Sequence, residues 1–340
     1  MTLRRLVVAI LAALVLGGAW LWVRLGQHPS LDPYAGLALP ARRGPVGVTV
    51  RFLGVSTLVV SDGETVWMTD GFFSRPGFLR TAFGRIAPDA SAIASALDGA
   101  GVRRLAAVIV LHSHYDHAMD APLVAAATGA ALVGSESTAN VARGLDFPAA
   151  RFVALRDGMV LRHGAFEIEP IRSRHFPHGM AMGEITAPLV PPARATDYLD
   201  GGTWSLLVRH PSGTMLIHGS AGWAEGMLAG RQADVVLLGI GGLGTKDEAY
   251  RDAYWREVVD ATHPRLLVPI HWDDFTIPLD RPLQPMPTLL DDFDASMRFL
   301  IERAATDPEL SLGMFLAAGE ERRLLPPPAL CQFVAWDAGT

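Results

Sequence analysis

A cluster of histidines that directly follows an apolar run constrains this sequence more than any other segment. Residues 105–111, Leu-Ala-Ala-Val-Ile-Val-Leu, predict a buried strand, because an unbroken run of apolar and β-branched residues is typical of one. His112, His114, Asp116 and His117 come next in the chain. Imidazole nitrogens and carboxylate oxygens are the ligands of catalytic zinc-type sites, which keep one coordination position open for water. The sequence therefore predicts a metal site at the end of a strand.

The spacing within this cluster suits two ions better than one. His112 and His114 alternate with Ser113, so an extended segment points both imidazoles to the same side. Asp116 and His117 are adjacent and diverge, which favours a second ion close to the first. A chance cluster of solvated histidines is the alternative, but with 11 histidines in 340 residues such fixed offsets seldom arise by accident.

Composition limits the class of protein. Hydrophobic residues make up 50% of the chain and charged residues 19%, which excludes a disordered protein. The net charge of -6, without any long run of Lys or Arg, argues against nucleic acid as a partner. Cys331 is the only cysteine, so the chain has no internal disulfide and its metal ligands must be histidines and carboxylates.

The N-terminal segment indicates where the chain resides. Arg4 and Arg5 precede an uninterrupted apolar stretch, residues 6–23, which as a helix would be about 27 Å long and match the core of a bilayer. The basic start favours a cytoplasmic N-terminus with the remainder exported. We therefore expect residues 1–24 to form a single-pass anchor in the inner or plasma membrane, with a periplasmic domain. The small residues 17–19 leave a cleaved signal peptide and a secreted protein as the alternative.

The remaining chain divides into a predicted linker and one domain. Residues 25–46 contain four prolines and are expected to be the linker, and residues 47–340 the folded domain. Hairpin patterns come first and strands alternate with helices later, which predicts sheets flanked by helices in a layered α/β arrangement. Strands are predicted at residues 48–53, 57–60, 65–69, 105–111, 131–133, 159–162, 165–172, 203–209, 214–218, 235–240 and 265–270. Helices are predicted at residues 88–97, 120–127, 137–143, 248–261 and 288–304.

The motif His112-x-His114-x-Asp116-His117 after an apolar strand resembles the metal motif of the metallo-β-lactamase superfamily. Segments 69–76, 174–176 and 270–272 resemble further motifs of that family in the expected order, and the likeness runs from about residue 48 to about 305. Arg174-His175-Phe176 resembles the branch that contains ascorbate-6-phosphate lactonases and N-acylphosphatidylethanolamine phospholipases D. The resemblance implies a four-layer αββα sandwich with the metal site at the edge between two sheets.

The resemblance also implies a ligand set. His112, His114 and His175 would hold the first metal, with His178 as a competitor for the role of His175. Asp116, His117 and His271 would hold the second metal. Asp70 would orient a liganding imidazole by hydrogen bonding, which fixes the tautomer of the ring. Zinc is the expected ion, and manganese or iron(II) are alternatives.

One position departs from the family pattern. Ser220 stands where the family places an aspartate that bridges the two metals. A neutral hydroxyl is a poorer bridge than a carboxylate, so we expect either one metal or a weakened second site. His218 lies two residues earlier on the same side of the strand, and it is expected to pack in the core, with a contact to the metal site as the alternative.

The resemblance implies a metal-dependent hydrolase that attacks a lactone, an ester or a phosphodiester through a metal-bound water. Asp116 would accept or relay a proton, and Ser220 is a second candidate catalytic residue. The apolar insert at residues 180–198 is expected to border the pocket, which favours a small or amphiphilic substrate. An anchored metal-binding or scaffold protein with a non-catalytic site is the alternative. The sequence leaves the oligomeric state open.

Overall fold

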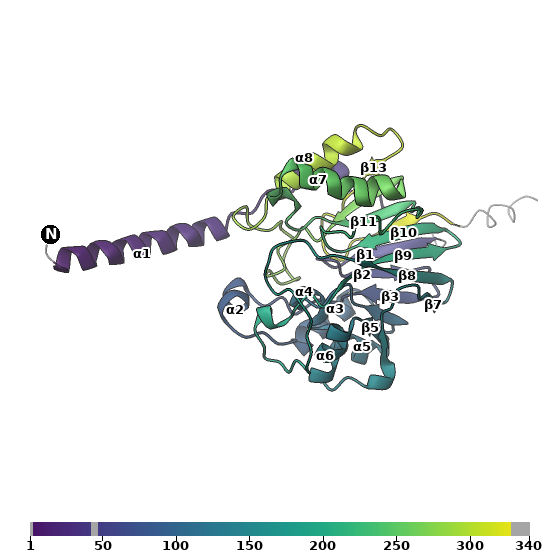
Figure 1. Ribbon diagram of the computed structural model, residues 1–340, viewed down its shortest axis with the longest axis horizontal. Coiled ribbons are helices and arrows are strands. Elements are labelled where there is room, and N and C mark those ends of the chain that lie inside the picture. Colours follow the sequence, from purple (N-terminus) through teal and green to yellow (C-terminus); the bar gives the residue numbers. More distant parts are fainter. Residues whose placement is uncertain (1–2, 42–46, 328–340) are drawn as a thin grey trace, which may run out of the picture.

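Two seven-stranded sheets form the centre of the domain in the computed structural model, which describes residues 3–41 and 47–327 (Figure 1). The first sheet has the strand order β14-β1-β2-β3-β4-β5-β6 and the second β13-β12-β11-β10-β9-β8-β7. The strands of the first sheet are β1 (Val48–Phe52), β2 (Leu58–Ser61), β3 (Val66–Thr69), β4 (Ala107–Ile109), β5 (Ala131–Gly134), β6 (Phe152–Ala154) and β14 (Glu321–Leu325). Those of the second are β7 (Leu161–His163), β8 (Phe166–Ser173), β9 (Thr203–His210), β10 (Gly213–His218), β11 (Val235–Gly239), β12 (Leu266–Ile270) and β13 (Ser311–Leu312).

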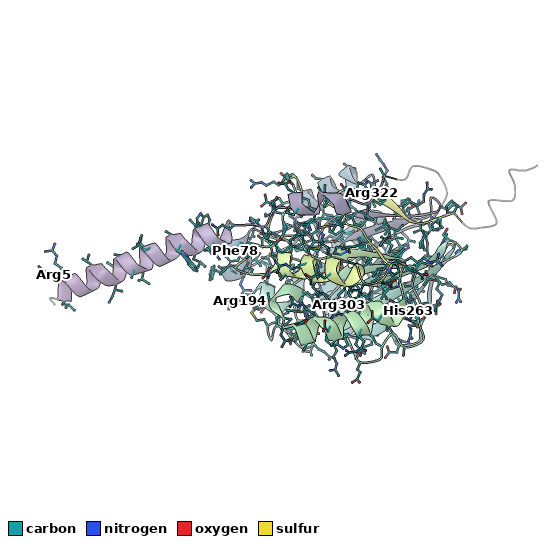
Figure 2. The ribbon with its side chains drawn as sticks, turned by 90° about the horizontal axis from the view of Figure 1, so that it is seen from above. Arg5, Phe78, Arg194, His263, Arg303 and Arg322 are labelled. Atoms are coloured by element: carbon teal, nitrogen blue, oxygen red, sulfur yellow. The ribbon has the colours of Figure 1, made fainter. Side chains whose placement is uncertain are left out.

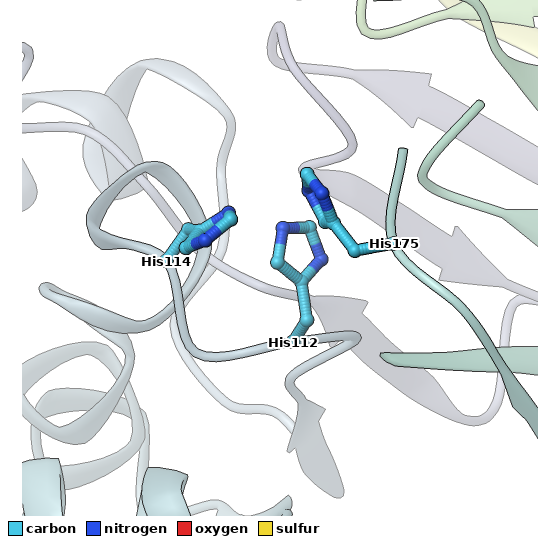
Figure 3. Close-up of side chains that lie close together, drawn as sticks. All are labelled: His112, His114 and His175. Carbon is cyan, nitrogen blue, oxygen red and sulfur yellow. The ribbon is translucent and has the colours of Figure 1, made fainter. Parts of the chain in front are cut away.

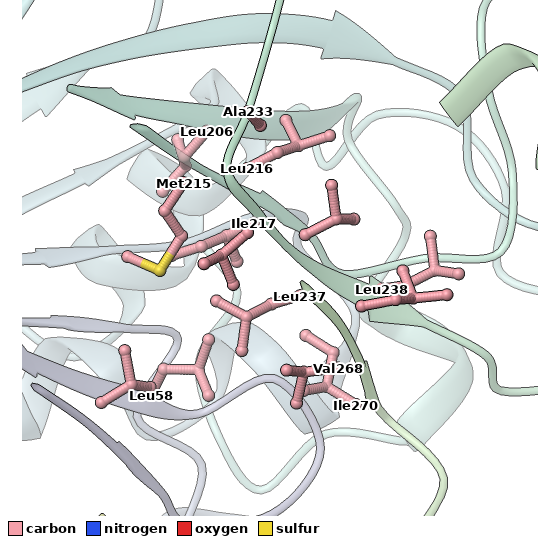
Figure 4. Close-up of a cluster of buried hydrophobic side chains, with 14 of the residues drawn as sticks. Leu58, Leu206, Met215, Leu216, Ile217, Ala233, Leu237, Leu238, Val268 and Ile270 are labelled. Carbon is pink, nitrogen blue, oxygen red and sulfur yellow. The ribbon is translucent and has the colours of Figure 1, made fainter. Parts of the chain in front are cut away.

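The sheets pack face to face on one apolar core. In β1 the residues alternate between buried and partly exposed, so Val48, Val50 and Phe52 all point into that core. Figure 4 shows Leu58 of β2 across from side chains of the second sheet, among them Leu237. Because both inner faces are buried by each other, each sheet needs helices only on its outer face.

Helices cover both outer faces. The first sheet is covered by α3 (Ala90–Gly99), α5 (Ala121–Thr128) and α6 (Glu136–Gly144), which close a second apolar core. The second sheet is covered by α7 (Glu248–Trp255) and α8 (Phe293–Ala304) on the opposite side in Figure 1. The predicted αββα sandwich is confirmed.

Several element bounds differ from the sequence prediction. α8 begins at Phe293 rather than near residue 288, because the Asp292 side chain caps it by accepting from the amide of Ala295. α7 ends at Trp255 and passes into a π-helical turn, Arg256–Asp260. The short helices α2 (Phe78–Phe83) and α4 (Tyr115–Ala118) were not predicted. The predicted strand at residues 105–111 forms only over Ala107–Ile109, and the one predicted at residues 159–162 is shifted to Leu161–His163.

The segment predicted as a linker packs on the domain instead. After α1 (Leu3–Leu25), a 3₁₀ helix at Asp32–Leu37 buries Tyr34, whose hydroxyl donates to Asp294 Oδ1 at 2.7 Å. Leu39 is also buried, and its amide donates to the carbonyl of Met314 at 3.0 Å. Residues 42–46, the end of the predicted linker, lie outside the described residues.

The domain extends beyond the end of the family resemblance. β13 adds an edge to the second sheet beside β12, and β14 pairs antiparallel with β1 at the edge of the first. Both strands lie after residue 305, so the C-terminal segment completes each sheet. Cys331 falls outside the described residues.

A buried ion pair connects three loops at one end of the sandwich. Arg75 Nη2 lies 2.7 Å from Asp273 Oδ2, and neither side chain is exposed. Asp273 Oδ1 accepts from the amide of Val55 at 2.6 Å. Arg75 Nη1 donates to the carbonyls of Asp274 and Ile277, each at 3.3 Å. We call this group of contacts the Arg75–Asp273 clamp.

We predict that Gly54→Ala destabilises the domain by at least about 3 kcal/mol, because it breaks the clamp without removing either charge. Gly54 has φ +85°, and an added Cβ would lie 1.9 Å from Arg75 Nη2. Gly63→Ala is the matched control: its φ is +94°, but no atom lies within 4 Å of the added Cβ, so only a backbone cost of about 1–2 kcal/mol remains. Chemical unfolding of both variants measures the difference, and equal losses would show that the clamp contributes nothing.

Candidate metal centre

The candidate site lies where strands of both sheets end. Asp70 follows β3, His112 comes after β4, His175 after β8, Ser220 after β10, and His271 directly follows β12. β3 and β4 are parallel neighbours, as are β10, β11 and β12, so their carboxyl ends meet at one edge of the sandwich. The fold therefore brings residues together that are up to 201 positions apart in the sequence, from Asp70 to His271.

His112, His114 and His175 form the first group of potential ligands. One ring nitrogen from each lies within 4.8 Å of the others, and Figure 3 shows the three imidazoles turned toward one another. The ring centroids are 4.9 Å apart for His112 and His114, and 4.4 Å apart for His114 and His175. The structure thus places the three residues as a facing triplet.

His112 provides the sharpest test of whether this group suits a metal. Its side chain is buried, yet neither ring nitrogen has a hydrogen-bond partner among the described residues. Burying an unpaired polar nitrogen is costly, and a bound cation would give one of these nitrogens a partner. Burial, with the nearby histidines His117 and His175, lowers the pKa of His112 well below its usual value. The ring is therefore neutral and available as a ligand.

The other two imidazoles each keep a nitrogen free for the centre. His114 Nε2 donates to the carbonyl of Ala181 at 3.0 Å, which leaves Nδ1 as the acceptor. His175 Nδ1 donates to the carbonyl of Phe176 at 2.8 Å, which leaves Nε2. Hydrogen bonds of this kind select the tautomer of metal-binding histidines. Burial lowers the pKa of His175 to about 2, so this ring is neutral too.

Asp116, His117 and His271 form the second group. Asp116 Oδ2 lies 3.4 Å from His117 Nε2 and 3.4 Å from His271 Nε2, and the two nitrogens are 3.2 Å apart. Asp116 and His117 lie in α4, the single helical turn that follows His114. The rings of His117 and His112 have centroids 3.7 Å apart, so the two groups adjoin.

Asp70 holds the second group in place. Its Oδ2 accepts from His117 Nδ1 at 2.8 Å and from the Ser56 hydroxyl at 2.7 Å, while Oδ1 accepts from the amide of Leu111 at 2.8 Å. The other ring nitrogen of His117, Nε2, therefore faces Asp116 and His271. Although burial opposes the charged ring, the carboxylates of Asp70 and Asp116 raise the pKa of His117 to about 10. This negative surrounding favours a cation beside His117 Nε2, whether that cation is a proton or a metal.

The backbone around the second group is strained. Val55, Asp70 and His271 have φ values of 53°, 56° and 58°. Residues other than glycine seldom adopt such backbone angles. The amide of His271 donates to the carbonyl of Val55 at 2.7 Å, and Asp273 of the Arg75–Asp273 clamp follows two residues later. The clamp thus holds the conformation that turns the His271 ring toward Asp116.

Ser220 ties the third histidine segment to β10. Its hydroxyl oxygen accepts from the amide of Phe176, the residue after His175, at 2.9 Å. The family resemblance implies a metal-bridging aspartate at this position, and Ser220 borders the same cavity as His114, His175, Asp116 and His271.

Two other histidines stay outside both groups. His178 is exposed, and its Nδ1 accepts from the amide of Met180 at 3.1 Å, so it lies at the rim while His175 lies in the triplet. His218 is buried beside Tyr254, and its Nδ1 lies 2.7 Å from the Ser205 hydroxyl. His218 therefore packs in the core, as expected.

A cavity of about 380 Å³ opens over the two groups. Besides site residues, its walls include the apolar side chains Phe176, Met180, Phe275, Met286 and Leu290. None of the described residues that line it is Arg or Lys. The insert predicted at residues 180–198 contributes Met180, Ala181, Ala195 and Thr196 to its border.

The sequence analysis missed three residues that shape the site. Ser56 supports Asp70, Asp273 supports the His271 segment, and Asp291 lines the cavity. Asp291 Oδ2 accepts from the amide of Gly242 at 2.9 Å, and burial raises the pKa of this carboxyl to about 6. Only Asp273 had a sequence signal, its position two residues after a histidine at a strand end.

We predict that His112→Ala removes the metal of the first group, because it deletes the ligand whose ring nitrogens have no hydrogen-bond partner in the described part of the chain. His218→Ala is the matched control, since it removes a buried histidine that lies outside both groups. Elemental analysis of the purified proteins measures the metal content. Full metal content in the His112 variant would refute the assignment.

We predict that Ser220→Asp raises occupancy of the second group, because it adds an anionic oxygen beside the cations. The wild type should bind one metal tightly and one weakly, and the variant should bind two with comparable affinity. Ser220→Asn separates charge from size. Calorimetric titration decides the matter, and two tight sites already present in the wild type would contradict the prediction.

No protein-family model matches the sequence, and no curated protein matches it either. Among solved structures, the isothiocyanate hydrolase from Delia radicum gut bacteria is similar, with a TM-score of 0.50 and 15% identity over 82% of this chain and 100% of that one. A possible metal-dependent hydrolase from Veillonella parvula has a TM-score of 0.50 and 13% identity over 82% and 100%. The metallo-β-lactamase fold protein YhfI from Bacillus subtilis has a TM-score of 0.49 and 12% identity over 81% and 98%.

These likenesses concern the fold, and the resemblance to the lactonase and phospholipase D branch stays a prediction. Two seven-stranded sheets face each other, helices cover both outer faces, and the histidine groups lie at one edge of the sandwich. The chain has the four-layer αββα sandwich of the metallo-β-lactamase fold.

Proposed function

We propose that this protein is a metal-dependent hydrolase that acts on a carboxylic ester or lactone. The observation that carries the proposal is the buried His112 ring, with two unpartnered nitrogens at the centre of two ligand groups under an open cavity. A divalent cation held there supplies an activated water and polarises the carbonyl oxygen of the substrate. Zinc suits the imidazole-rich donor set, and manganese or iron(II) remain alternatives.

Residues of the chain have separate roles in this proposal. His112, His114 and His175 hold one cation, and Asp116, His117 and His271 hold the other. His117 and His271 lower the pKa of Asp116 well below its usual value although burial opposes this shift, so the carboxylate is ionised at neutral pH. An ionised Asp116 at the cavity wall can accept a proton from the water that attacks the substrate.

The walls of the cavity favour an uncharged substrate over a phosphodiester. Proteins recognise phosphate groups mainly with Arg and Lys side chains, which bind the charged phosphate oxygens. The described lining has neither, and Asp291 adds a buried carboxyl group instead. Apolar walls around a few polar groups suit the acyl portion of an ester or lactone. The apolar lining without Arg or Lys among the described residues therefore leads us to prefer an ester or lactone over a phosphodiester.

We also propose that α1 anchors the protein in the inner or plasma membrane, with the domain outside the cytoplasm. α1 is long and apolar enough to cross a bilayer, and its side chains are not buried by the domain. Arg4 and Arg5 at its start favour a cytoplasmic N-terminus. A signal sequence has the same composition, so a secreted protein is the alternative.

Hydrolysis by the full-length protein in detergent tests the proposed reaction. After chelation, addition of zinc should restore turnover of short esters and lactones well above that of a phosphodiester, and the His112→Ala variant should stay inactive. Manganese and iron(II) are tested in parallel. Preferred cleavage of the phosphodiester would overturn the substrate class, and full metal content without any turnover would favour an anchored scaffold protein.

A further inference from the structure

We propose that the mouth of the cavity docks on the surface of the bilayer that holds α1, so that an amphiphilic substrate enters from the lipid. The proposal rests on the proposed membrane anchoring and adds a second contact with the same membrane. It commits to a lipid surface, and contact with another protein is an outcome that would overturn it.

The end of α1 is attached to the cavity wall. Two residues beyond α1, the carbonyl of Gln27 accepts from the amide of Thr288 at 3.2 Å, and His28 Nδ1 bonds to the carbonyl of Pro285 at 2.8 Å. Met286 and Leu290, on the same loop, line the cavity. The cavity therefore opens close to the point where α1 leaves the domain.

Large apolar side chains are exposed at this mouth and on the helix α2. Leu290 and Met180 line the cavity yet are 45% and 65% exposed. In α2, Leu79 is 56% exposed and Phe83 is 83% exposed. We call Leu79, Phe83, Met180 and Leu290 the apolar rim. Moving exposed apolar groups of this size out of water lowers the free energy, and several of them on one face indicate a contact surface.

α2 lies on the side of the domain that faces α1. In Figure 1 it lies at the end of the body from which α1 leaves, below the C-terminal end of that helix in this view. Figure 2, turned by 90°, shows Phe78 and Arg194 at the same end. The strand-like pairing of Ile86 with Ala193 joins α2 to the insert that borders the cavity. A membrane around α1 would thus meet the apolar rim first.

Charge distinguishes a bilayer from a purely apolar partner. Arg80, Arg85 and Arg194 are exposed around α2, and Arg85 Nη1 donates to the carbonyl of Pro192 at 3.2 Å. Apolar side chains flanked by basic ones are typical of segments that lie in the headgroup region of an anionic membrane. α1 already brings this face to a membrane, so no separate partner is needed to cover it.

Site-specific fluorescent probes on the full-length protein in vesicles test the docking. In a Cys331→Ser background, single cysteines replace Phe83 or Leu290 in the rim, Leu14 in α1, and Val160 as the control. Val160 is 39% exposed and precedes β7, at the end of the body opposite α1. The vesicles contain phosphatidylcholine and phosphatidylglycerol with a nitroxide-labelled lipid as quencher.

We expect strong quenching at Leu14, Phe83 and Leu290, and none at Val160. Quenching at Leu14 without quenching at Phe83 and Leu290 would overturn the docking and leave the anchor intact. No quenching at Leu14, or loss of its label with a cleaved segment, would overturn the proposed anchor. In that case the rim probes on the mature chain, added to the same vesicles, still decide the docking.

Discussion

The ion pair between Arg75 and Asp273 is the contact on which the geometry of the site depends. It is fully buried, and it joins the loop after β3 to the loop after β12, so it connects the two sheets at the edge where the ligand groups lie. Removing one partner of such a pair strongly destabilises the folded state, because the remaining charge stays buried without a partner. Val55 completes the contact through its amide. The left-handed backbone of His271 is tolerated because this network holds it.

The two ligand groups differ in their electrostatic surroundings. The three histidines of the first group are neutral rings with lowered pKa values, and no carboxylate among the described residues hydrogen-bonds to them. The second group contains Asp116 and is supported by Asp70, which together keep the potential around His117 negative. A cation in the first group would therefore be bound mainly through nitrogen lone pairs, and one in the second also through charge.

The sequence predicted those features of the structure that depend on residues close together in the chain. Periodicity and turn residues identified most strands, and the spacing of His112, His114, Asp116 and His117 pointed to residues that the structure brings together, because these signals lie within a few residues. Contacts between distant segments left no such signal: Ser56 beneath Asp70, Asp291 in the cavity wall, and the packing of Tyr34 against α8. Helix bounds also failed where a side-chain cap decided them, as at Asp292. The prolines of residues 25–46 suggested a linker, but composition alone does not reveal that Tyr34 in this segment packs on the domain.

The short connection between α1 and the domain has a mechanical consequence. Only Gly26 separates the last residue of α1, Leu25, from Gln27, which is already hydrogen-bonded to the loop at Thr288. A joint of one residue leaves little room for the domain to swivel about the helix axis. This short connection therefore restricts the direction in which the cavity can open relative to α1.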